Sequence, residues 1–93
     1  MARLIARIRI LPADADSNLQ EVIQSIKRDV PQGMEMKGHA MEPIAFGLNA
    51  IIADFLLDDS EGQMDKLEES IKRIEGVGEI EVTNISRQSV KMK

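Results

Sequence analysis

The chain has 93 residues, which is enough for one domain with a single core but too few for a separate catalytic lobe. Hydrophobic residues make up 43% of it and aromatic residues only 2%, so the core must be aliphatic, which favours helices packed on a sheet. The absence of cysteine excludes disulfides, zinc–thiolate sites, iron–sulfur clusters and thiol nucleophiles. With one histidine as well, we expect no metal site and no cofactor.

The charge and the N-terminal segment bear on partners and location. A net charge of -4 argues against nucleic-acid binding through bulk electrostatics. The N-terminal segment interleaves arginines with apolar residues, whereas a signal peptide needs an unbroken apolar stretch after its basic start. The longest apolar run, residues 48–57, is much shorter than the ~20 residues of a membrane span. We therefore expect a cytoplasmic protein without a membrane partner or a direct nucleic-acid partner.

The first half of the chain predicts a strand, a helix and a second strand. Residues 3–11 alternate between apolar and basic side chains, which is typical of a half-buried strand. Ser17 and Gln20 fit a capping box at the start of the helix that follows. Residues 34–41 alternate again. Pro43 comes soon after them and cannot donate to a ladder, which places this second strand at an edge.

The second half predicts a strand, a helix and a fourth strand. Residues 48–57 favour a central strand that is covered on at least one side. Ser60 and Gln63 repeat the capping-box chemistry at the start of the second helix. Residues 79–83 alternate as a fourth strand, and we expect residues 84–93 to form a basic tail.

The element order is strand, helix, strand, strand, helix, strand. The sequence Ser-Ile-Lys-Arg occurs in both helices, at residues 25–28 and 70–73, at the same stage of each half. This order and the repeated four-residue sequence predict a ferredoxin-like α+β sandwich, in which two helices cover one face of a four-stranded antiparallel sheet. The first and third strands should be central and the other two should be edges. Residues 1–93 should form a single domain.

The open face of this sheet should be strongly charged, with apolar residues between the charged rows, which suggests a partner surface. On the third strand, we expect Leu48, Ala50, Ile52, Asp54 and Leu56 on this face. The charged residues expected there from the other strands are Arg3, Arg7, Arg9, Glu35, Lys37, His39, Glu79 and Glu81. The arginines could pair with Glu79, Glu81 and Asp54, or they could recruit an acidic partner or RNA.

Two further features admit two interpretations each. Asp58 and Asp59 could bind a hard cation, but their place before Ser60 favours stabilisation of the helix start. Phe46 lies between Pro43 and a glycine, so we expect it at the tip between the second and third strands, either as an interface anchor or as a loop-packing residue.

Catalytic motifs are missing from the sequence. It contains no Gly-rich phosphate loop, no Gly-x-Ser-x-Gly elbow, no His/Asp cluster and no paired buried carboxylates. We therefore assign no catalytic residue and do not expect an enzyme.

The segment Pro-Ile-Ala-Phe-Gly-Leu at residues 43–48, the strand that ends in two acids and the acid-rich helix after it together resemble translation elongation factor 1-beta. The chain is similar to the short archaeal form, which corresponds to the exchange domain of the longer eukaryotic proteins. The resemblance covers almost the whole chain. It implies a ferredoxin-like fold and guanine-nucleotide exchange on elongation factor 1-alpha, the GTPase that delivers aminoacyl-tRNA to the ribosome.

The same resemblance implies a set of partner-binding residues. The proline-aromatic-glycine turn maps onto Pro43, Phe46 and Gly47, and a basic residue at the start of the first strand maps onto Arg3. A lysine near the C-terminus of the family enters the magnesium and phosphate region of the GTPase, where a cation would compete with Mg²⁺. In this sequence Lys91 or Lys93, or even Arg87, could take that role.

Two other functions are compatible with the element order. A small-molecule regulatory module of the ACT type usually has a glycine-bearing turn after its first strand, and residues 11–16 contain no glycine. An RNA-recognition sheet needs exposed aromatic residues on its central strands, whereas residues 3–9 supply charge but no ring.

Overall fold

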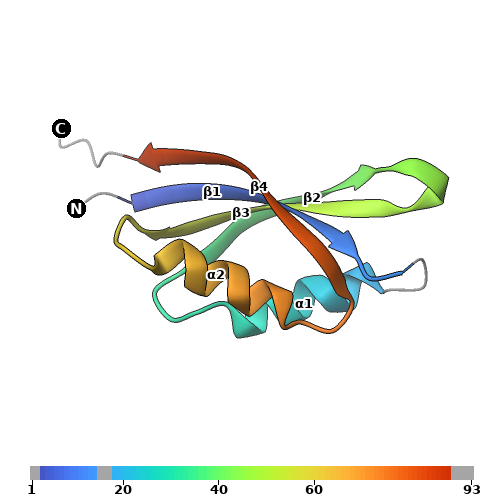
Figure 1. Ribbon diagram of the computed structural model, residues 1–93, viewed down its shortest axis with the longest axis horizontal. Coiled ribbons are helices and arrows are strands. Elements are labelled where there is room, and N and C mark those ends of the chain that lie inside the picture. The colour runs from blue at the N-terminus through green and yellow to red at the C-terminus, as the bar shows by residue number, and fades with distance from the viewer. Residues whose placement is uncertain (1–2, 15–17, 89–93) are drawn as a thin grey trace.

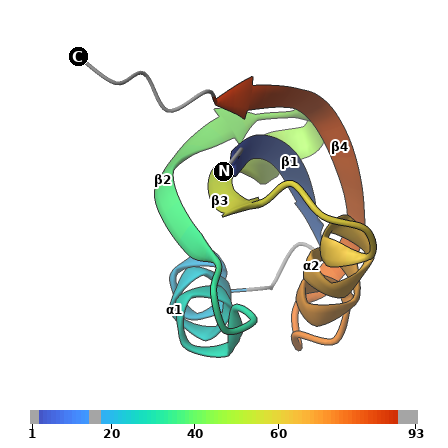
Figure 2. The same cartoon turned by 90° about the vertical axis from the view of Figure 1, so that its left-hand side faces the viewer.

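The computed structural model describes residues 3–14 and 18–88, with only the backbone described for Phe46 and Gln88. In chain order, the elements are β1 (Arg3–Pro12), α1 (Leu19–Asp29), β2 (Glu35–Pro43), the 3-10 helix η1 (Ala45–Gly47), β3 (Asn49–Asp58), α2 (Gln63–Lys72) and β4 (Val77–Gln88). The strand order is β2-β3-β1-β4, and every neighbouring pair is antiparallel. Both helices lie on one side of the sheet (Figures 1 and 2). The predicted ferredoxin-like α+β sandwich is confirmed, with β1 and β3 at its centre.

The core lies between the sheet and the two helices. Ile51, Ala53, Phe55 and Leu57, which alternate along β3 with the residues expected on the open face, are fully buried. From the other elements, the core cluster takes Ala6, Ile8, Ile10, Val22, Ile23, Ile26, Met34, Leu67, Ile71 and Ile74. The alternation of strands and the three-to-four spacing of helices therefore meet in one aliphatic layer around the ring of Phe55.

Both helices begin differently from the capping boxes that the sequence predicted. Asn18 caps α1, because its side-chain oxygen accepts the N–H groups of Gln20 at 3.0 Å and Glu21 at 3.2 Å. Ser17, the predicted cap, lies outside the described residues. The Ser60 box before α2 is wrong: the N-cap is Gly62, whose φ of 86° turns the chain so that a backbone carbonyl, not a side chain, accepts the Gln63 N–H.

A register shift in β2 explains one error about the open face. Met36 pairs with Phe55 and Gly38 pairs with Asp54, so Lys37 is the extra residue of a bulge. Because the bulge inverts the alternation that follows, His39 pairs with Ala53, whose side chain is buried on the helix side. The prediction that His39 lies on the open face is therefore wrong.

A second shift, in β4, explains why the predicted tail began too early. Ile8 pairs with Val82 and Arg7 pairs with Asn84, which leaves Thr83 as the extra residue. Its hydroxyl donates to the Arg7 carbonyl at 3.2 Å. The alternation breaks at this point, but the backbone ladder with β1 continues to Gln88. Residues 84–88 are thus part of the sheet, and not of a tail.

The molecule is elongated, with extents of 47 × 22 × 18 Å. The hairpin that joins β2 to β3 projects at one end, on the right in Figure 1. The start of β1 and the ends of β3 and β4 meet at the opposite end, because Arg3 pairs with both Asp58 and Gln88. This separation sets the geometry of the candidate site.

Candidate partner-binding surface

Two ends of the sheet carry the predicted site residues. We call residues 43–49 the hairpin end, and we call Arg3, Asp58, Asp59, Arg87 and Gln88 the strand-terminus end. Pro43, Phe46 and Gly47 belong to the first and Arg3 to the second. The structure therefore does not bring the predicted residues into one cluster, but separates them along the long axis of the sheet (Figure 1).

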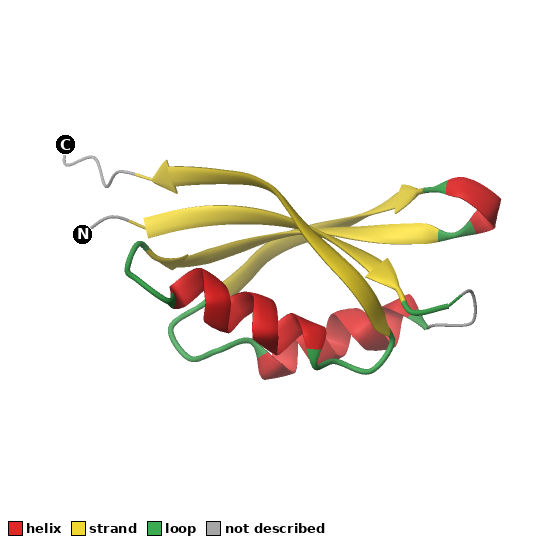
Figure 3. Cartoon of the chain, in the orientation of Figure 1, coloured by secondary structure: helices red, strands yellow, loops and turns green. Residues whose placement is uncertain are grey.

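The hairpin end is closed by backbone geometry. The Ile44 N–H donates to the Leu48 carbonyl at 2.8 Å, and the Leu48 N–H donates to the Ala45 carbonyl at 3.2 Å. Gly47 has a φ of 75°, a conformation that other residues rarely adopt. The short helix η1 forms the tip, as Figure 3 shows, so the predicted location of Phe46 at the tip is confirmed for its backbone. Its role in binding stays a prediction.

Paired charges hold the strand-terminus end. The Arg3 Nε lies 3.1 Å from Asp58 Oδ1, without the angle of a hydrogen bond, and an Arg87 guanidinium nitrogen lies 2.7 Å from Asp59 Oδ2. The two carboxylates thus bind arginines, whereas the sequence favoured a role at the start of α2. Lys91 and Lys93 lie outside the described residues.

The remaining arginines of β1 pair across the open face. Arg7 donates two hydrogen bonds to Asp54, at 2.9 and 3.2 Å. These bonds, reinforced by the charge attraction, raise the pKa of the Arg7 guanidinium above its ordinary value, so it stays charged at any physiological pH. Arg9 lies 3.0 Å from Glu42 and 3.7 Å from Glu81. Both Asp54 and Glu81 were among the predicted partners, and the stripe is a set of compensated pairs.

The Arg9–Glu42 pair also accounts for the burial of Ala50. Arg9 is on β1 and Glu42 is on β2, so their ion pair crosses the intervening strand β3. Glu42 pairs in register with Ala50, which is 0% exposed although it is not part of the core cluster. Ala50 is on the open face, as expected, but it is buried there. We infer that the crossing side chains cover it, which a small residue at this position permits.

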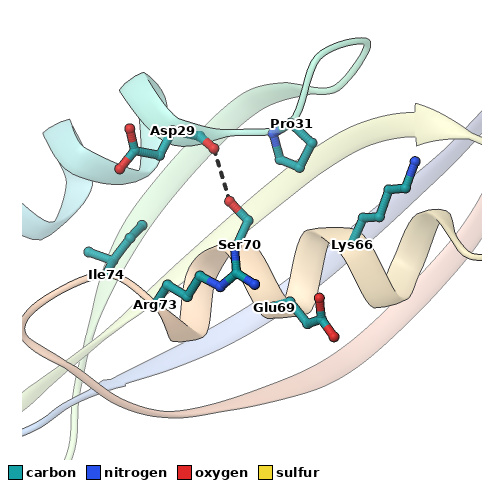
Figure 4. A pocket seen from close by; sticks show the side chains of 7 residues that line it. All are labelled: Asp29, Pro31, Lys66, Glu69, Ser70, Arg73 and Ile74. Atoms are coloured by element: carbon teal, nitrogen blue, oxygen red, sulfur yellow. Dashed lines mark hydrogen bonds between the residues drawn. The ribbon is translucent and has the colours of Figure 1, made fainter.

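A groove of about 410 Å³ lies on the helix side, between α1 and α2. Its lining residues carry both signs of charge, and Figure 4 shows the Ser70 hydroxyl donating to the Asp29 carbonyl, at 2.9 Å. This bond satisfies a carbonyl at the end of α1 and helps to join the helices. Among the residues that the structure describes, no three or more His, Cys, Asp or Glu side chains gather as a metal site would require.

The fold and these surfaces define a class: a small α+β sandwich that presents two ends of one sheet, suited to binding another macromolecule. The model of the EF-1 guanine nucleotide exchange domain family matches residues 5–87, which is almost the whole sheet and both helices. The chain belongs to this family, and the family function is nucleotide exchange.

Several archaeal proteins named elongation factor 1-beta are similar to the chain over nearly its full length. The protein of Staphylothermus marinus is 36% identical over 94% of the chain and 98% of the relative. The protein of Archaeoglobus fulgidus is 39% identical over 91% of the chain and 97% of the relative. The protein of Methanocella arvoryzae is 39% identical over 94% of the chain and 98% of the relative. In the described part of the chain, no helix is long and apolar enough to cross a membrane.

Proposed function

We propose that the chain, as a single domain of residues 1–93, promotes the exchange of GDP for GTP on elongation factor 1-alpha during protein synthesis in the cytoplasm. The observation that carries the proposal is the family match over residues 5–87, from β1 to near the end of β4. The names of the similar archaeal proteins support the same partner.

Exchange of this kind makes no covalent change, so the protein needs no catalytic residue. An exchange factor binds the nucleotide-free GTPase better than the GDP-bound form, and this difference in affinity is what drives release. The free energy must come from contacts that form fully only when GDP has left. Such contacts need surface and not a pocket, which agrees with a sheet that presents both of its ends.

At the hairpin end, Pro43, Phe46 and Gly47 are the proposed contacts. Pro43 and Gly47 are exposed, and the two backbone hydrogen bonds of the tip fix where the Phe46 backbone lies. A pre-shaped tip loses little entropy on binding, so an aromatic residue there is suited to act as an anchor.

At the strand-terminus end, Arg3 and the C-terminal lysines are the proposed contacts. A lysine ammonium is a compact charge on a flexible stem, and Lys91 or Lys93 would compete with Mg²⁺ for the phosphate oxygens of the GTPase. The sheet length supports contact at two separated places on the partner, since the hairpin end and the strand-terminus end are at opposite ends of a 47 Å molecule.

The test is to preload elongation factor 1-alpha of the same host with fluorescent GDP and to follow its release with and without the protein. Acceleration that saturates with protein concentration is the expected result, and unchanged release would refute the proposal. Binding assays with free amino acids and with single-stranded RNA are run beside it. Tight binding in either assay, without accelerated release, would favour the regulatory-module or RNA-recognition alternative.

A second measurement tests whether residues 91–93 take part in the exchange. Deleting residues 91–93 should reduce the acceleration strongly if Lys91 or Lys93 enters the magnesium and phosphate region. Unchanged acceleration would exclude the tail while leaving the exchange function in place.

A further inference from the structure

Two consecutive carboxylates hold arginines that come from two different strands. Asp58 is the last residue of β3 and pairs with Arg3 at the start of β1, at 3.1 Å. Asp59 follows directly and pairs with Arg87 near the end of β4, at 2.7 Å. We call these four residues the strand-end clamp. It ties the end of β4 to the end of the central strand β3.

The two pairs are on opposite faces of the sheet. Arg87 pairs in register with Leu4, whose side chain packs against the core, so Arg87 is on the helix side. Arg3 precedes Leu4 in the strand and therefore points to the open face. The clamp thus restrains the strand ends from both sides, which a single ion pair does not do.

The backbone ladder with β1 continues to the end of β4, but the side chains there add few other restraints. It is an edge strand with β1 as its only neighbour in the sheet, and residues 83–87 are all exposed. Ile85 is 48% exposed, so apolar packing contributes little here. Among the described side chains, Arg87 provides the one ion pair of residues 84–88. Its partner Asp59 is the more sheltered of the two, with 28% of its side chain exposed against 65% for Arg87.

We propose that Asp59 is a positioning residue for nucleotide exchange, which acts by holding Arg87 and so fixing the direction of the chain just before its C-terminal lysines. Lys91 follows Arg87 by four residues in the sequence, so the point at which the end of β4 is held limits where both lysines can act. This inference rests on the proposed function. It assigns to Asp59 no contact with the GTPase.

The decisive experiment combines Asp59→Asn with deletion of residues 91–93 in the GDP-release assay. In the full chain, D59N should lower the acceleration about two- to fivefold, the effect expected for loss of one well-placed surface ion pair. In the chain that lacks residues 91–93, D59N should change nothing further, because there is no lysine left to position. An equal reduction in both backgrounds, or none in the full chain, would overturn the inference.

A charge exchange provides the rescue. The double variant D59R/R87D keeps an ion pair of opposite polarity and should recover a large part of the lost acceleration. Failure to recover, in a protein with unchanged melting temperature, would mean that Asp59 or Arg87 acts by direct contact, and positioning would be excluded. The matched control is Asp29→Asn, which breaks the exposed Arg28–Asp29 pair at the end of α1 and should leave the acceleration unchanged.

The proposed function and the positioning role of Asp59 can be refuted separately. If the wild-type chain does not accelerate GDP release at all, the proposed function is refuted and the positioning role falls with it. If the wild-type chain accelerates release but D59N behaves alike with and without residues 91–93, only the positioning role is refuted.

Discussion

The hairpin end and the strand-terminus end are fixed by different kinds of interaction. At the hairpin end, two backbone hydrogen bonds and the left-handed Gly47 close a tip that has no ion pair among its described side chains. At the strand-terminus end, two arginine–carboxylate pairs join three strands. The first kind of restraint is nearly independent of salt, whereas exposed ion pairs are screened.

The difference indicates how the two ends can contribute to one function. A tip held by its own backbone presents the same shape in any solution. An end held by charges is sensitive to the charges of whatever binds beside it, which suits a surface that approaches phosphate and Mg²⁺. We expect variants at the hairpin end to weaken binding without changing its salt dependence, and variants at the strand-terminus end to change both.

The largest effects should come from the two phenylalanines, which test whether the hairpin end serves the partner and not the fold. Phe46→Ala should reduce the acceleration of GDP release by about 30-fold or more, as loss of an interface anchor does, while stability changes little. Phe55 is fully buried, so Phe55→Ala should lower the free energy of unfolding by about 3–5 kcal/mol. Urea unfolding and the release assay separate the two. A large loss of stability in F46A would show instead that its ring packs in the fold.

A second pair of variants tests which parts of the edge strands are crowded. A Cβ at Gly78 would lie 2.7 Å from the Pro12 carbonyl oxygen, whereas a Cβ at Gly38 would meet nothing within 4 Å. Gly78→Ala should therefore destabilise the protein by about 1–3 kcal/mol. Gly38→Ala should be neutral or slightly stabilising, because alanine restricts the unfolded chain. Equal melting temperatures for the two variants would contradict this difference in packing.

The variant Gly47→Ala tests whether the backbone shape of the tip matters for exchange. No atom would obstruct the new Cβ, so the effect is the backbone strain of alanine at a φ of 75°, about 1 kcal/mol. Strain at an exposed tip can relax by local opening. We expect a modest fall in melting temperature and a clear fall in exchange activity. Full activity in G47A would mean that the exact shape of the tip is unimportant.

The smallest expected effect is a pH dependence of stability at the Arg28–Asp29 pair, which lies away from both ends. The hydrogen bond from Arg28 lowers the pKa of Asp29 below its ordinary value of 3.8. Desolvation offsets part of this shift, and the positive charge of Arg28 adds to it. The stabilisation is therefore present above about pH 4 and is lost as the pH falls through the lower, folded pKa. Urea unfolding of the wild type and Asp29→Asn should differ slightly at pH 7 and converge in acid. A constant difference would contradict the shift.

Regular periodicity made most of the sheet predictable. The inward residues of β3 and the central place of β1 and β3 follow from alternation and from the position of Pro43. The errors began where one extra residue interrupts the period, at Lys37 and Thr83. A bulge has no reliable sequence signal, because the same residues would alternate equally well without it.

Side chains that bridge strands were predicted less well than the strands. Asp54 as a partner of Arg7 followed from its place on the neighbouring strand, whereas Glu42 as a partner of Arg9 did not, since β3 lies between them. Asp58 and Asp59 illustrate the same limit. Their nearest neighbours in sequence favoured the helix start, and their partners come from the two ends of the chain.

The sequence by itself determined the order of the elements, the aliphatic core, the one-sided sheet and the position of Phe46 between β2 and β3, because local periodicity and turn chemistry encode them. Only the tertiary structure decided that the hairpin end and the strand-terminus end are on opposite ends of the sheet, and that Asp59 holds Arg87. The physical reason is that strand register and bulges decide which side chains of different strands lie close together. Both depend on pairing between residues that are far apart in the sequence.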